Sequence, residues 1–113
     1  MKGFEHTQKE VTMLFILVET DINMRLRQMP EDGVRGARQA RVNIIAMVNN
    51  YRRELRKLKT QEPDYKEEIQ DVIDAISAPD FNYLELDKED FTLRILRHLL
   101  ATRTEIEKNF GEF

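Results

Sequence analysis

The sequence predicts an all-α fold, in which a long antiparallel helical hairpin and two shorter helices are arranged like a four-helix bundle. Apolar residues recur every three or four positions along most of the chain, which is the period of one helix face. The 113 residues include only four glycines and three prolines, the residues that most often interrupt helices. We therefore expect one helical domain over residues 1–113, with helices at about 7–29, 33–60, 64–78 and 87–110.

The first two predicted helices form the hairpin. Thr7 and Glu10 have the spacing of a capping box, so the first helix is expected to begin at Thr7. Residues 30–33 contain proline and glycine and predict a tight turn, after which the second helix returns antiparallel. The apolar seam of this second helix follows a three-four alternation, which requires a facing helix. Its members are Val34, Ala37, Ile44, Val48, Tyr51, Leu55 and Leu58.

Arg41 is the one residue that interrupts this seam. A cation at a core position extends its charge to solvent, pairs with a buried acid or fixes a packing register. The candidate acids are Glu31, Asp32 and the acidic C-terminal half of the chain, and a small anionic ligand is a further alternative.

The second half of the chain supplies the two remaining helices. Asp64 is expected to cap the third helix and Pro79 to end it. Residues 81–86 are expected to form a short strand or an apolar loop packed onto the core. Asp87 is expected to cap the last helix, which ends at Gly111.

Two helices carry more apolar surface than one bundle needs. Residues 11–18 are apolar nearly all round a helix, and the last helix is apolar over much of its circumference. The second helix, about 40 Å long at 1.5 Å per residue, is too long for the two shorter helices to cover. We therefore expect a homodimer or higher oligomer, with a closed monomeric bundle as the alternative. The expected interface residues are Val11, Leu14, Phe15, Val18, Ile44, Val48, Tyr51 and Leu55.

Charge is distributed unevenly, although the net charge is only -3. Residues 24–59 hold ten basic and three acidic residues, and residues 60–113 hold six basic and fourteen acidic ones. Either the two segments complement each other, or the basic one binds an external anion or nucleic acid. We favour the first interpretation, because nucleic-acid-binding domains are usually basic overall. The candidate binding residues are Arg35, Arg38, Arg41, Arg52, Arg53, Arg56, Lys57 and Lys59.

An acidic cluster in the third predicted helix supports an alternative function. The string EIQD at residues 68–71, preceded by Glu67, resembles the second half of the acidic motif in MazG-type nucleotide pyrophosphohydrolases. Those all-helical enzymes hydrolyse nucleoside triphosphates with Mg²⁺. The first half of the family motif needs two acids one turn apart, and here the matching stretch holds only Glu54. The resemblance therefore implies a weak magnesium site at Glu54, Glu67, Glu68 and Asp71.

Composition excludes several other functions. The chain has no cysteine, which rules out a disulfide framework, a thiolate zinc site and a thiolate nucleophile. Its longest apolar run, residues 11–18, is too short to span a bilayer, and we expect no signal peptide before it. We expect a cytoplasmic, non-enzymatic interaction or regulatory protein without a cofactor or membrane partner. Such a protein would bind itself and another protein, like the small helical regulators and inhibitors of phages and mobile elements.

Overall fold

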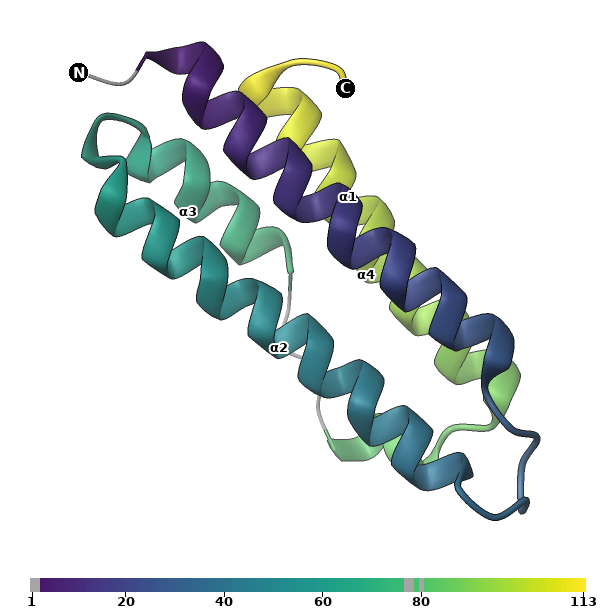
Figure 1. Ribbon diagram of the computed structural model, residues 1–113. Helices are drawn as coiled ribbons and strands as arrows, with labels where there is room; N and C mark the ends of the chain where they lie inside the picture. The colour runs from purple at the N-terminus through teal and green to yellow at the C-terminus, as the bar shows by residue number, and fades with distance from the viewer. Residues whose placement is uncertain (1–2, 77–78, 80) are drawn as a thin grey trace.

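Four α-helices make up most of the structure (Figure 1). The computed structural model describes residues 3–76, 79 and 81–113, and all statements below concern these residues. The helices are α1 (Phe4–Gln28), α2 (Ala37–Gln61), α3 (Lys66–Ala75) and α4 (Lys88–Phe110), with two 3₁₀ helices, η1 (Pro63–Tyr65) and η2 (Phe81–Glu85). The predicted all-α, bundle-like fold is confirmed. Of the two helices predicted to be shorter, only α3 is short, with 10 residues. The other, α4, has 23 residues, close to the 25 of α1 and of α2.

The helices pack in a ring, α1 against α2, α2 against α3, α3 against α4 and α4 against α1. Successive helices run in opposite directions, so the predicted antiparallel hairpin of α1 and α2 is present (Figure 1). The short α3 covers the half of the bundle nearer the chain termini, and η2 packs against α2 in the other half. None of the helices within the described ranges is long and apolar enough to cross a membrane.

The core follows the predicted seam of α2 and continues into the other helices. Val34 is the exception, because it lies in the α1–α2 loop with 52% of its surface exposed. The buried seam residues are Ala37, Ile44, Val48, Tyr51, Leu55 and Leu58. Facing side chains include Val11, Phe15, Ile22 and Leu26 of α1, Ile69 and Val72 of α3, and Phe91, Ile95 and Ile106 of α4.

The first helix begins earlier than predicted, at Phe4, so the assignment of Thr7 as its cap is wrong. Thr7 lies inside α1 and is fully buried. The reason is tertiary packing, because the Phe4 ring lies 5.8 Å from each of the rings of Tyr65 and Phe110. These contacts stabilise an additional turn of helix before Thr7.

The second helix begins later than predicted, at Ala37. Gly33 and Gly36 have φ angles of +79° and +90°, in the left-handed region that glycine adopts without steric cost. The chain therefore stays non-helical through Gly36, and the connection between α1 and α2 is longer than a tight turn.

The capping prediction at Asp64 is also wrong. Asp64 lies within η1, whose turn is closed by a hydrogen bond from the Tyr65 amide to the Glu62 carbonyl, and no side chain of the described residues caps α3. At its other end α3 stops at Ala75, before Pro79. Residues 77 and 78, the last of the predicted third helix, lie outside the described residues.

The link to α4 contains a helical turn rather than a strand. Phe81–Glu85 forms η2, so the strand alternative is wrong, while the expected contact with the core is confirmed by the burial of Leu84. Both predicted ends of the last helix are confirmed. The Asp87 side chain accepts a hydrogen bond from the Asp90 amide at 2.8 Å, and α4 ends at Gly111, which has a φ of +89°.

Candidate interaction surfaces

The outer side of α1 and α4 carries a cluster of exposed apolar residues. On α1 these residues are three, four or seven positions apart, which places them on one stripe of the helix. The same spacing relates the residues on α4. We call the set the outer apolar face, and the exposed fraction of its members ranges from 39% to 68%. Its members are Met13, Ile16, Leu17 and Met24 of α1 and Leu93, Leu96 and Leu100 of α4.

The two stripes lie on adjacent, antiparallel helices, and polar contacts and a groove lie between them. Arg103 of α4 lies 3.8 Å from the carboxylate of Glu19 on α1. Further along, a groove of about 420 Å³ runs between the helices and is lined by both, including Thr20 of α1 and Leu96 of α4. Exposed apolar side chains gathered on two neighbouring helices are typical of a protein–protein contact.

Most residues assigned to an interface from the sequence lie inside the bundle instead. Leu14 and Val18 are partly buried against the core. The other six are at most 4% exposed, so the chain uses them for its own packing. They are Val11, Phe15, Ile44, Val48, Tyr51 and Leu55. The free apolar surface is the outer apolar face, and its signal in the sequence was the second three-four series in α1, out of phase with the core.

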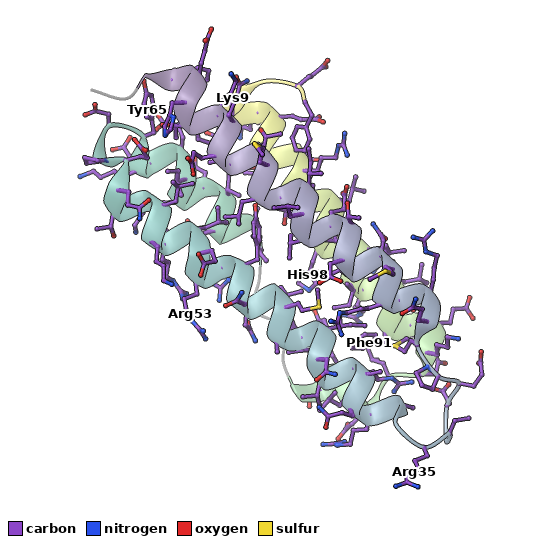
Figure 2. The ribbon with its side chains drawn as sticks, in the orientation of Figure 1. Lys9, Arg35, Arg53, Tyr65, Phe91 and His98 are labelled. Atoms are coloured by element: carbon purple, nitrogen blue, oxygen red, sulfur yellow. The ribbon has the colours of Figure 1, made fainter. Side chains whose placement is uncertain are left out.

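Most predicted basic residues lie on α2 and the preceding loop in two groups, one near the start of α2 and one near its end, where Lys59 donates a hydrogen bond to Gln70 of α3 at 2.6 Å. Arg35 and Arg53 point away from the bundle (Figure 2). We call the set the basic surface, and it comprises Arg35, Arg38, Arg52, Arg53, Arg56, Lys57 and Lys59. Lys57 pairs with Glu54 of the same helix at 3.2 Å. Within the described ranges, no ion pair joins this surface to an acid of α3 or α4. In the described residues, the basic surface and the acidic C-terminal half therefore complement each other in charge without direct ion pairs.

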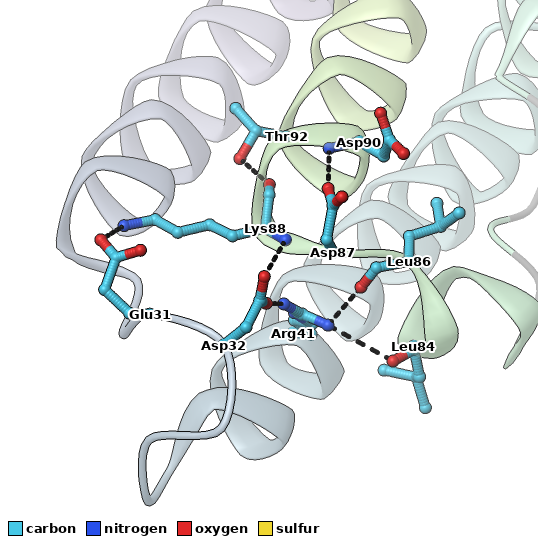
Figure 3. A network of polar contacts seen from close by, with 9 residues as sticks. All are labelled: Glu31, Asp32, Arg41, Leu84, Leu86, Asp87, Lys88, Asp90 and Thr92. Atoms are coloured by element: carbon cyan, nitrogen blue, oxygen red, sulfur yellow. Dashed lines mark hydrogen bonds and ion pairs between the residues drawn. The ribbon is translucent and has the colours of Figure 1, made fainter.

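Arg41 is separate from the basic surface because it is buried, with only 6% of its surface exposed. Its guanidinium donates hydrogen bonds to the Leu86 carbonyl at 2.5 Å and the Leu84 carbonyl at 3.4 Å, and also to the Asp32 carboxylate (Figure 3). The guanidinium carbon lies 5.7 Å from the centre of the Phe91 ring. Of the candidate partners, Asp32 is the one that Arg41 contacts, so the partner of Arg41 is an acid of this chain.

Asp32 extends this network to the start of α4. Its other carboxylate oxygen accepts the Lys88 amide at 3.1 Å, and the Lys88 ammonium lies 2.7 Å from Glu31 (Figure 3). The Lys88 amide, aided by the Arg41 and Lys88 charges, lowers the pKa of Asp32 below its usual value although burial acts in the opposite direction. The network ties the α1–α2 loop to α2 and α4, which is a structural role.

The carboxylates of the magnesium alternative are not assembled into a metal site. Glu54 lies on α2 beside Lys57, while Glu67, Glu68 and Asp71 lie on α3. Throughout the part of the chain that the structure describes, no three His, Asp or Glu side chains are placed to hold a metal ion. The arrangement that the MazG resemblance implies is therefore missing from these residues.

His98 makes a structural contact between α4 and η2. Its Nε2 atom lies 2.8 Å from the Tyr83 hydroxyl. Partial burial, with a contribution from the nearby Arg94 charge, lowers the pKa of His98. A neutral imidazole at neutral pH suits this contact, because the hydroxyl can then donate to Nε2.

Comparison with known proteins adds no functional assignment. No protein-family model, curated protein or solved structure is significantly similar to the chain.

Proposed function

We propose that the chain is a non-enzymatic, cytoplasmic interaction protein with regulatory function. In this proposal, two copies associate through the outer apolar face, and their charged surfaces contact a further macromolecular partner, most directly another protein. The observation that carries the proposal is the exposure of seven large apolar side chains on adjacent helices. Large apolar side chains gathered on adjacent helices favour a partner that covers them.

The test removes apolar surface at the two most exposed positions of that face. Leu17 and Leu100 are 68% and 64% exposed, so replacing both with Gln leaves the core of the single chain intact. Burial of a leucine contributes about 1.5–3 kcal/mol, so we expect the dissociation constant of a dimer to rise by at least about 100-fold. Sedimentation equilibrium over a range of protein concentrations measures this change, and circular dichroism checks the fold.

A matched control changes apolar residues elsewhere on the surface. Val34 in the loop and Val42 on α2 are 52% and 36% exposed and lie outside the outer apolar face. The Val34→Gln, Val42→Gln variant should associate like the original chain. A monomeric original chain, or equal association of the leucine and valine variants, would contradict the proposal.

The basic surface supports a second candidate function, nucleic-acid binding. Arg35, Arg38, Arg53 and Arg56 are exposed, and within the described ranges none of them forms an ion pair with an acid. Such cations can neutralise phosphates along a nucleic-acid backbone.

Fluorescence anisotropy with labelled duplex DNA and RNA tests this candidate at several salt concentrations. Binding through the basic surface should weaken as salt rises and should fall in an Arg53→Glu, Arg56→Glu variant. The exposed Lys108 at the end of α4 provides a control, and Lys108→Glu should bind normally. Absence of binding at low salt, or equal loss in the control, would exclude α2 as a nucleic-acid site.

A further inference from the structure

The outer apolar face is bounded by charged residues in a regular pattern. Lys9 and Arg27 lie beyond the two ends of the apolar stripe on α1, whereas Glu89 and Glu107 lie beyond the two ends of the stripe on α4. Lys9, Arg27 and Glu89 are exposed, and the Glu107 side chain is 36% exposed. These four positions flank the stripe of α1 with cations and that of α4 with anions, while Glu10 and Arg103 also lie beside the stripes and Arg103 pairs with Glu107 at 3.2 Å.

The two charged pairs have the same spacing. Eighteen residues separate Lys9 from Arg27, and eighteen separate Glu89 from Glu107. That separation is five helical turns, or about 27 Å, so both members of each pair lie on the same side of their helix. The distance along α1 from Lys9 to Arg27 is therefore the same as the distance along α4 from Glu89 to Glu107.

The pairs are also level with each other along the bundle. Near the termini, Gln8 of α1 donates a hydrogen bond to the carbonyl of Phe110 on α4, which puts Lys9 and Glu107 at the same end. At the other end, Arg27 and Thr92 line the same groove, and Glu89 lies one turn before Thr92. Each cation of α1 thus has an anion of α4 at its own level.

We infer that the outer apolar face binds a second copy of this chain with each α1 lying on the partner's α4. This inference rests on the self-association proposed above. A two-fold axis parallel to the helices produces the arrangement, and a two-fold interface is self-complementary by symmetry. Lys9 then lies opposite the partner's Glu107, and Arg27 lies opposite the partner's Glu89. The interface contains two copies of each of these pairs.

These four charges disfavour the other two-fold packing of the same faces. An axis perpendicular to the helices places α1 on the partner's α1 in reverse, so that Lys9 meets the partner's Arg27. The same rotation brings Glu89 against the partner's Glu107. All four contacts are then between like charges, which is unfavourable at an interface. Apolar burial supplies most of the affinity, and the charges select the orientation and register.

Charge reversal tests the orientation. The α1-reversed variant carries Lys9→Glu and Arg27→Glu, and the α4-reversed variant carries Glu89→Lys and Glu107→Lys. Each variant alone converts four attractions into four repulsions, so its self-association should weaken by about tenfold to 100-fold in sedimentation equilibrium at low salt. The variant with all four changes restores every attraction and should associate like the original chain.

A second charge-reversal experiment uses only Arg27 and Glu89. It leaves Glu107 unchanged, because Glu107 also accepts a hydrogen bond from Arg103 at 3.2 Å. Arg27→Glu and Glu89→Lys, made singly, should each weaken association, and the two changes together should restore it. Circular dichroism and a thermal melt of every variant exclude unfolding as the cause of any loss.

Cross-linking measures the arrangement directly, because the chain has no cysteine. Ile16→Cys and Leu100→Cys lie level with each other, and a mixture of the two single variants is treated with a short bismaleimide. We expect links between the two variants and few within either variant. Ile16→Cys linking mainly to itself would indicate the perpendicular axis and overturn the inference.

The outcomes separate this inference from the proposed function. An original chain that stays monomeric contradicts both. A dimer that the Leu17→Gln, Leu100→Gln variant abolishes, but that every charge reversal leaves unchanged, supports the proposed function and overturns the inferred orientation. Loss in the reversed variants with recovery in the combined ones supports both.

Discussion

At the end of the bundle that holds both termini, the rings of Phe4, Tyr65 and Phe110 join α1, η1 and α4. At the opposite end, Arg41 and Asp32 join the α1–α2 loop, α2 and α4 through charged hydrogen bonds. The ring contacts of the aromatic end are apolar and non-directional, beside a hydrogen bond from Gln8 to the Phe110 carbonyl and a 3.7 Å contact of His6 with Glu62. The polar end depends on charge and on exact donor and acceptor positions.

This difference indicates a division of roles between the two ends. Burial of large rings supplies stability, whereas a buried cation with several acceptors fixes which segments meet. A buried ion pair is weak evidence for net stability, but removal of one partner is costly because polar groups are left unpaired. The two ends should therefore respond differently to substitution, pH and salt.

The largest effect is expected at the aromatic end, from Phe110→Ala. Phe110 is 1% exposed and contacts Phe4, so its truncation leaves a cavity that should reduce the free energy of unfolding by about 3–5 kcal/mol. Urea denaturation measures the change. Phe113→Ala is the control, because Phe113 is 39% exposed and should cost much less. Equal effects at the two positions would mean that the aromatic end is not a packed core.

Arg41→Met should produce the next largest effect, at the polar end. Methionine keeps an apolar side chain at this position but leaves the Leu84 and Leu86 carbonyls without their donor. Asp32 is half exposed and can be rehydrated, so we expect a loss of about 2–3 kcal/mol in urea denaturation. Arg38→Met, at an exposed position of the same helix, should change stability by less than about 0.5 kcal/mol. Similar losses of unfolding free energy in both variants would show that the Arg41 network does not stabilise this end of the bundle.

The number and type of helices could be predicted because they depend on local periodicity. The seam from Ala37 to Leu58 carries its own three-four pattern, and its burial requires no knowledge of the rest of the chain. The caps of α4 at Asp87 and Gly111 were likewise determined by neighbouring residues. Arg41 was recognisable as a misfit in the seam, and its acid was among the predicted candidates.

Features that depend on distant residues could not be predicted. The start of α1 is set by rings at positions 65 and 110, and no local pattern reveals that contact. The apolar excess of residues 11–18 was visible, but which of them face outward depends on the sides at which α2 and α4 pack against α1. The outer apolar face therefore became definable only once α4 was placed.

Thr7→Val distinguishes the predicted helix start from the observed one. If Thr7 capped the helix, its replacement would lower the free energy of unfolding by about 1 kcal/mol. In the structure, however, Thr7 is fully buried and its hydroxyl has no hydrogen-bond partner among the described residues. Removing that hydroxyl should leave stability unchanged or raise it by up to about 1 kcal/mol in urea denaturation. Asp87→Ala, at a true cap, should lower stability by about 1 kcal/mol.

The smallest effect is the pH dependence of the polar end. The pKa of Asp32 lies below its ordinary value of 3.8 in the folded protein, mainly because its carboxylate accepts the Lys88 amide. The unfolded chain therefore binds the proton more readily, so the contribution of Asp32 is fully present well above pH 3.8 and is lost as pH falls through the lower, folded pKa.

The difference in melting temperature between the original chain and Asp32→Asn measures this contribution. It should be constant near neutral pH and shrink toward zero below about pH 4, with only a modest size because the side chain is solvated. Glu85→Gln controls for general effects of charge near this end, since Glu85 is exposed and lies in η2 beside the network. A difference that persists unchanged at low pH would show that Asp32 acts through packing or loop conformation, and the polar end would then resemble the aromatic end in its physical basis.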